Sequence, residues 1–174
     1  MKKTLFITFC WIFSFNSFAL GECKQLKTCA EYVGMQTSVK YDLGKFEKKS
    51  LKMEPQFKMT SANADQLFVY LLEQNNLFRV ATTDGNYRIL DRKEFQSYQF
   101  PKIDAQNLKF SFDFYTFEYA IKTTHLKSML LTIAKKMISK NGRVLENVGE
   151  NKITIVESGA NIHRIIGVFT ELDK

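Results

Sequence analysis

The sequence predicts an α+β protein made of two small domains, each a small sheet packed with two helices, the second in βαββα order. Apolar residues alternate between helical and strand periodicity, and the period changes twice within residues 141–174. Two blocks of this kind flank a polar stretch, residues 92–109, that contains Pro101. The 45% hydrophobic composition is ordinary for a soluble globular chain.

Residues 1–19 are expected to be a secretory signal peptide. Lys2 and Lys3 precede an apolar run that is too short for a good membrane span, and small residues at 17 and 19 suit signal peptidase. We expect cleavage after Ala19, with Gly21 as the alternative site and an uncleaved anchor as the minority case. Glu22 directly precedes Cys23, which argues against lipid attachment.

The remaining chain is mildly basic, but its charges are interleaved. Stretches such as "KKSLKMEPQFK" and "AKKMISK" build no single basic face. No second hydrophobic run reaches membrane-spanning length. A solvated surface therefore explains these charges better than a phosphate-binding site, and we consider nucleic acid an unlikely partner.

Removal of the signal peptide, which contains Cys10, leaves Cys23 and Cys29. Export permits a disulfide between them, provided that Cys23 precedes the helix that contains Cys29, because two cysteines six residues apart within one helix are too distant. The alternative is that Cys29 is a small buried residue on a helix face. Neither case indicates catalysis.

Residues 20–91 are expected to form the first domain. A helix in "KQLKTCAEYVGM" should stop at Gly34, and strands follow in "TSVKYDL" and "KKSLKMEPQFKMT", where Pro55 suggests an edge or a bulge. Ser61 or Asn63 caps an amphipathic helix. "NNLFRVATTDGNYRILD" then predicts a hairpin that turns at residues 84–86.

Residues 92–109 lack sustained periodicity and are expected to link the two domains. "KFSFDFYTFEYA" follows as a long aromatic strand whose phase slips, which predicts a bulge near Phe114. Both faces of this strand carry aromatic residues, and we expect part of them to pack in the core and part to form an interaction surface. The candidate surface residues are Phe110, Phe112, Phe114 and Tyr115.

Residues 110–174 are expected to form the second domain. Thr123 or Thr124 caps its clearest helix, which should end at residues 141–142 and bury one stripe: Leu126, Met129, Leu130, Ile133, Ala134 and Met137. Strands "GRVLENV" and "KITIVE" follow, and Ser158 caps a last helix. Both helices should cover one sheet face and leave the other to solvent or a partner.

No residue is assigned as catalytic, cofactor-binding or metal-ligating. His125 and His163 each lie near a helix start without a cysteine pair or carboxylate cluster at metal-ligand spacing. The sequence lacks the nucleophile-elbow, zincin, P-loop and dinucleotide fingerprints. We therefore expect a non-enzymatic protein with no cofactor, although carboxylates such as Glu118 could meet others in the fold.

The stretch "NGRVLENVGENKITIVESGANIHRIIGVFTELD" resembles the small repeated, KH-like periplasmic domain of bacterial secretins, and this resemblance covers residues 112–174. "SANADQLFVYLLEQNNLFRVATTDGNYRILDRKE" is similar to the secretin amino-terminal domain, which also occurs as the signalling domain of outer-membrane iron-uptake receptors. A secretin continues into a pore-forming barrel, and this sequence stops at Lys174.

The resemblance implies a periplasmic ring subunit or adaptor of a secretion, type IV pilus or related trans-envelope system, associated with an outer-membrane complex. Its implied partners are itself, in a homo-oligomeric ring, a true secretin, or inner-membrane components. Two alternatives remain: a signalling or adaptor domain for an outer-membrane receptor, and a periplasmic DNA-binding protein of a DNA-uptake system. The second is the weaker, because KH-type nucleic-acid modules need a GxxG loop that is absent here.

Overall fold

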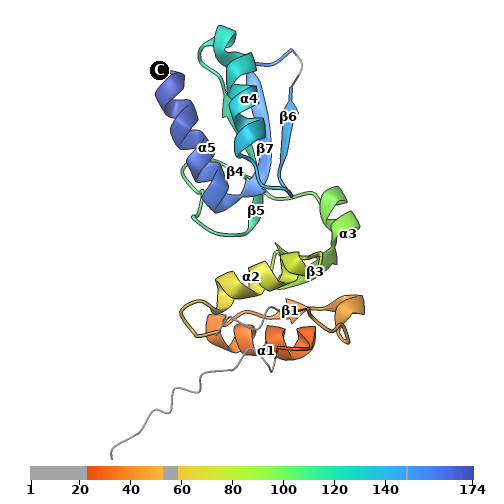
Figure 1. Ribbon diagram of the computed structural model, residues 1–174. Coiled ribbons are helices and arrows are strands. Elements are labelled where there is room, and N and C mark those ends of the chain that lie inside the picture. The colour runs from red at the N-terminus through yellow and green to blue at the C-terminus, as the bar shows by residue number, and fades with distance from the viewer. Residues whose placement is uncertain (1–22, 53–58, 148) are drawn as a thin grey trace, which may run out of the picture.

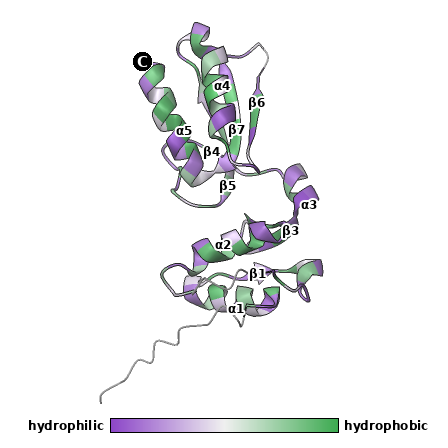
Figure 2. Ribbon diagram, viewed as in Figure 1, coloured by the Kyte–Doolittle hydropathy of each residue, from purple (hydrophilic) through white to green (hydrophobic). Residues whose placement is uncertain are grey.

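The computed structural model describes residues 23–52, 59–147 and 149–174, and it has the expected α+β fold with two mixed sheets (Figure 1). The predicted signal peptide and Pro55 lie outside the described residues. In Figure 2 the helices carry both apolar and polar residues, as expected for helices with one face in a core.

The first sheet has the strand order β1-β3-β2, in which β1 runs parallel and β2 antiparallel to β3. The predicted hairpin is confirmed, and its chain turns through Gly85 at a φ of 79°. The elements of this part are α1 (Leu26–Thr37), β1 (Tyr41–Asp42), the 3-10 helix η2 (Gly44–Phe46), α2 (Ala64–Gln74), β2 (Leu77–Ala81) and β3 (Tyr87–Asp91).

Helix α1 does not stop at Gly34, as the sequence predicted, but continues to Thr37 and ends at Ser38 in the left-handed conformation. A glycine is required at position 34 for a steric reason, because a Cβ built there would lie 2.6 Å from the backbone oxygen of Val39. The glycine lets the chain fold back closely against the helix. The longer helix also shortens the strand expected in "TSVKYDL", of which only β1 remains.

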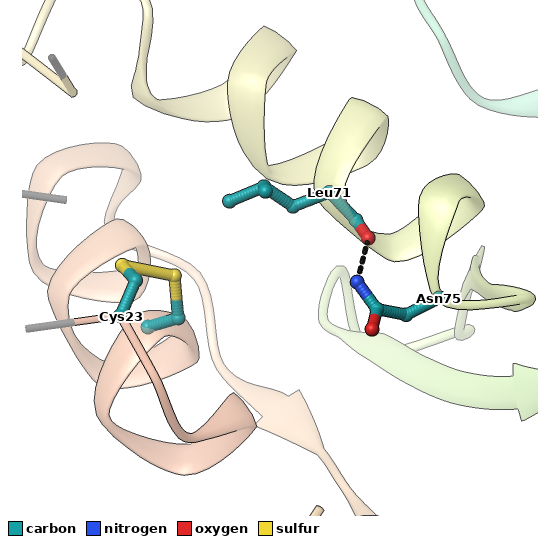
Figure 3. Close-up of a disulfide and its surroundings, with 4 residues drawn as sticks. Cys23, Leu71 and Asn75 are labelled. Carbon is teal, nitrogen blue, oxygen red and sulfur yellow. Dashed lines mark hydrogen bonds between the residues drawn. A yellow bond between two sulfur atoms is a disulfide. The ribbon is translucent and has the colours of Figure 1, made fainter. Parts of the chain in front are cut away.

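A disulfide joins the segment before α1 to the helix itself. Cys23 precedes α1 and Cys29 lies within it, their Cα atoms are 4.6 Å apart, and both side chains are fully buried (Figure 3). Nearby, the buried Asn75 amide at the end of α2 donates to the backbone oxygens of Leu71 and Lys52 and accepts from the Lys52 N–H. The disulfide thus ties the amino-terminal segment to α1, and Asn75 ties the end of α2 to the segment at Lys52.

The second sheet has the strand order β4-β5-β7-β6, with α4 and α5 sharing one core against it. The order β5, α4, β6, β7, α5 is the predicted βαββα arrangement. Its elements are β4 (Lys102–Ile103), β5 (Phe114–Ala120), the 3-10 helix η3 (Thr124–Leu126), α4 (Lys127–Met137), β6 (Arg143–Glu146), β7 (Lys152–Ser158) and α5 (Gly159–Leu172).

The stretch 92–109 is not the featureless linker that the sequence predicted. It contains α3 (Arg92–Ser97) and β4, which pairs in parallel with β5 and adds a fourth strand to the expected three. Helix α3 is stabilised by a capping box between Asp91 and Glu94, and it buries Phe95. Six residues are too few for a helical period to show in sequence.

Strand β5 has no bulge, contrary to the prediction. Its register with β7 is continuous from the pair Phe114 and Ser158 to the pair Ala120 and Lys152. The aromatic residues change parity because Phe110 and Phe112 precede the strand in a bent segment. Within β5, Phe117 and Tyr119 face the second core, and Phe114 faces the opposite side.

Helix α4 ends at Met137, earlier than predicted, and its buried stripe is rotated slightly from the expected one. Leu130, Leu131 and Ala134 are buried, whereas Met129 is 40% exposed and Ile133 is half-buried. At the end of the chain, the buried Asp173 carboxylate accepts from the backbone N–H groups of Lys122 and Thr123, which anchors α5 to the turn before η3.

We expect Leu130→Ala to lower the free energy of unfolding by about 2 to 5 kcal/mol, because its fully buried side chain would leave a cavity. Ile133→Ala should cost less, and the exposed Met129→Ala serves as the control on the same helix. Chemical unfolding of the three variants tests this order. Equal losses for Leu130→Ala and Met129→Ala would contradict the burial pattern.

We expect the exported protein to contain no free thiol, and reduction of the Cys23 to Cys29 bond to cost roughly 2 kcal/mol of stability, as expected for a short closed loop. Thiol titration of the denatured protein and urea unfolding with and without reductant measure both effects. Two reactive thiols in protein purified from the envelope would contradict the prediction.

Candidate protein interaction site

The four aromatic residues proposed as an interaction surface do not share one environment. Phe110 is 76% exposed and Phe112 is 39% exposed, and both belong to the segment that precedes β5. Phe114 is half-buried among the aromatic residues between the two sheets, and Tyr115 is half-buried against the second core. The exposed part of the candidate surface is therefore Phe110 with the open side of Phe112.

The segment that carries Phe110 is held against the start of α5. The N–H groups of Gly159 and Ala160 donate to the backbone oxygens of Asp113 and Ser111, at 2.9 and 2.8 Å. Gly159 is required here, because a Cβ would collide with the backbone oxygen of Lys109. These hydrogen bonds satisfy the first N–H groups of α5. They also fix the backbone of the segment that contains Phe110.

His163 on α5 also supports this segment. Its Nε2 lies 3.1 Å from the backbone oxygen of Leu108, and its ring centroid is 6.0 Å from that of Phe110. His163 therefore makes a structural contact between α5 and this segment.

The two sheets meet through an aromatic cluster, which we call the junction cluster. Ring centroids of Phe95 lie 4.4 Å from Phe78, 5.0 Å from Phe100 and 4.9 Å from Phe114, in stacked and edge-on arrangements. The cluster combines residues of β2, β3, α3, β5 and β7, namely Phe78, Val80, Leu90, Phe95, Phe100 and Val156 with Tyr98 and Phe114. The cluster covers part of one face of the second sheet, the face opposite α4 and α5. From the sequence, this face was expected to be open to solvent or to a partner.

A buried guanidinium lies beside the junction cluster. The side chain of Arg79 on β2 is only 4% exposed, and it forms ion pairs with Asp65 of α2 and with Asp113, whose Oδ1 lies 3.2 Å from Nη2. Nη1 also donates to the Tyr41 hydroxyl at 3.3 Å, and the guanidinium carbon lies 4.2 Å from the ring centroid of Tyr87. Tyr87 in turn donates to Asp113 Oδ2 at 3.0 Å.

The surroundings of Arg79 shift two pKa values. Burial lowers the pKa of Arg79, but the hydrogen bond that Arg79 donates to Asp65 and the charge of Asp113 outweigh it and raise the pKa overall, so the guanidinium stays charged. Burial is also the main cause that raises the pKa of Tyr87, helped by the negative charge of Asp113. Tyr87 therefore remains a hydrogen-bond donor at any physiological pH.

One further polar contact crosses the junction at another point. Arg143 of β6 donates to the backbone oxygens of Gln96 and Tyr98, at 2.5 and 3.4 Å, and so ties the second sheet to the turn after α3. Burial and the charge of Glu157 raise the pKa of Glu73 on α2, and a hydrogen bond with Asn141 opposes that shift.

A concave surface lies beside the first sheet, between α1 and the segment of β1 and η2. This groove has a volume of about 1070 Å³, and residues of both charges line it: Lys27, Glu31, Lys40, Asp42 and Glu47, together with Met35. Met35 is 73% exposed, although it is large and apolar. Sequence reasoning did not identify this groove, because it depends on how α1 lies against an edge strand.

Sequence reasoning also missed Arg79 and Asp113. A signal was present in "LFRVA", where Arg79 has the parity of Leu77, a core position, yet nothing in sequence names its partners. Among the described residues, no group of histidine, cysteine and carboxylate side chains could hold a metal ion. No helix in the described ranges is long and apolar enough to cross a membrane.

We expect Arg79→Leu to cost about 3 to 5 kcal/mol of stability, because it leaves Asp113 and Asp65 without their counter-charge in a largely buried site. Arg88→Leu on the neighbouring strand is the matched control: its pair with Asp42 is exposed, so the loss should stay below about 1 kcal/mol. Urea unfolding of both variants measures the difference. Similar small losses would show that the buried network adds little.

Neither a protein-family model nor a curated protein sequence matches the chain. Solved structures do match. A chain of the Klebsiella pneumoniae type II secretion system outer membrane complex, which contains PulD, PulS and the PulC HR domain, superposes with a TM-score of 0.64 at 10% identity, over 88% of this chain and 26% of that chain.

Two other matches have lower scores. The N-terminal domain of the secretin XcpQ from Pseudomonas aeruginosa has a TM-score of 0.32 at 16% identity, over 83% of this chain and 59% of that one. The enterotoxigenic Escherichia coli GspC-GspD complex from the type II secretion system also has a TM-score of 0.32 at 16% identity, over 91% and 95%. Of the three, the Klebsiella match indicates a shared fold, and this chain spans about a quarter of it. The chain therefore has a fold similar to the amino-terminal periplasmic domains of secretins, as the sequence resemblance predicted.

Proposed function

We propose that this protein is a non-enzymatic, periplasmic interaction component of a type II secretion-like trans-envelope complex, either a ring subunit or an adaptor. The observation that carries the proposal is the fold shared over 88% of the chain with a component of an outer membrane secretion complex. A predicted signal peptide supports export.

The contact surface in this proposal is the segment before β5. Phe110 is a large apolar side chain that is mostly exposed, and its backbone is fixed to α5 by the bonds of Gly159 and Ala160. A rigid, exposed aromatic residue is the kind of side chain that anchors protein interfaces, because it buries a large area at a small entropic cost. Phe112 extends this surface toward the junction, where it lines a small crevice with Val69 and Glu73.

The first experiment is light scattering of residues 20–174 across a concentration series, with binding to the secretin channel of the same cell measured in parallel. A large closed oligomer supports a ring subunit. A monomer that binds the channel supports an adaptor. A protein that neither self-associates nor binds the channel would overturn the proposal.

We expect Phe110→Ser to weaken this self-association or channel binding at least tenfold, since it removes the exposed anchor without touching either core. Leu145→Ser on β6 is the matched control, because Leu145 is also apolar and 53% exposed but lies on the far edge strand. Binding constants of both variants test the surface. An equal effect of the two substitutions, or none from Phe110→Ser, would move the contact elsewhere.

A further inference from the structure

We propose that Asp113, held between Arg79 and Tyr87, locks the angle between the two domains, so that the protein acts as one rigid body. The inference is independent of the proposed function, because it concerns the isolated chain. Figure 1 shows the two parts joined through the region of α3, with the second sheet standing above the first. A joint of this kind keeps one relative orientation of the two parts only if specific contacts select it.

The junction cluster alone would not select an angle. Its members are apolar, and the free energy of burying apolar area is non-directional, so this burial favours contact between the two parts without specifying one arrangement. The cluster therefore supplies attraction between the domains. Directional contacts are needed to choose one arrangement among the many that bury a similar area.

The hydrogen bond that the Tyr87 hydroxyl donates to Asp113 has this directional character, and the ion pair of Asp113 with Arg79 adds attraction between two charges whose positions are fixed. In the first domain, Arg79 is held by Asp65 and Tyr41 and is almost fully buried. In the second, the backbone oxygen of Asp113 accepts from the Gly159 N–H at the start of α5. The carboxylate reaches Arg79 with one oxygen and Tyr87 with the other, at 3.2 and 3.0 Å.

A single point of contact would still allow rotation about that point. Arg143 supplies a second one, since its guanidinium donates to the backbone oxygens of Gln96 and Tyr98, which lie at the end of α3. Two polar contacts at separate places restrict both the tilt and the twist of the second domain. The groove beside α1 and the exposed Phe110 are then presented to a partner at a constant relative position.

The cost of losing the lock also favours one arrangement. If the second domain turned away, Arg79 would keep Asp65 but lose a counter-charge in a site where its side chain is 4% exposed. Asp113, whose side chain is 14% exposed, would have to be rehydrated. Rotation is therefore penalised even when the phenylalanines remain covered.

The test is a set of residual dipolar couplings measured by NMR on residues 20–174. In the parent protein, one alignment tensor should fit the amide couplings of both domains. In Asp113→Asn and in Tyr87→Phe, each domain should still fit a tensor of its own, but the two tensors should differ in orientation or magnitude. Glu118→Gln is the matched control, because it breaks an exposed ion pair with Lys102 inside the second domain and should leave a single tensor.

Two variants on opposite sides of the contact keep the test decisive. Should Asp113→Asn disturb the fold of its segment, Tyr87→Phe removes only a hydroxyl from the other domain and retains the ring that lies against Arg79. Two different tensors in the parent protein would overturn the inference. A single unchanged tensor in Tyr87→Phe and in a folded Asp113→Asn would overturn it as well. Neither result depends on whether the protein binds a secretion complex.

Discussion

The buried charge of Arg79 is the constraint on which the arrangement of this molecule depends. A guanidinium out of water is tolerated only when carboxylates and hydrogen-bond acceptors surround it, and here the two carboxylates come from different parts of the chain. Asp65 belongs to a helix of the first domain and Asp113 to the segment before β5. Arg79 therefore forms an ion pair within the part of the chain that contains α2 and another with the segment before β5.

The junction also changes which surfaces remain for partners. In an isolated three-stranded domain, the sheet face opposite the helices would be open. Here part of that face is closed by rings from β2, α3 and β5, and Val156 of β7 lies beneath them. The exposed large apolar side chains of the described residues include Phe110 before β5, Leu145 on β6 and Met35 in the groove beside α1.

The fold persists at very low sequence identity, and the structure shows why this is physically reasonable. The Klebsiella chain superposes at only 10% identity. What the fold requires is a pattern of apolar positions such as Leu130, Ile155 and Phe169, together with glycines where the backbone approaches closely, and many residues satisfy the first requirement. The polar contacts of the junction are more particular, since a buried arginine needs partners of definite charge and geometry.

The sequence by itself determined the α+β class, the βαββα order and the hairpin at residues 84–86, because these depend on local periodicity and turn chemistry that a single stretch contains. The sequence also showed that the aromatic residues from Phe110 onwards do not follow the alternation of a single regular strand.

Tertiary structure alone decided that residues 92–109 contain α3 and β4, that β5 begins at Phe114, and that Phe114 and Tyr115 face different cores. It also decided the pairing of Arg79 with Asp113, for a physical reason. Short elements and buried ion pairs are stabilised by contacts between residues distant in sequence, and no local pattern records which distant residue will supply them.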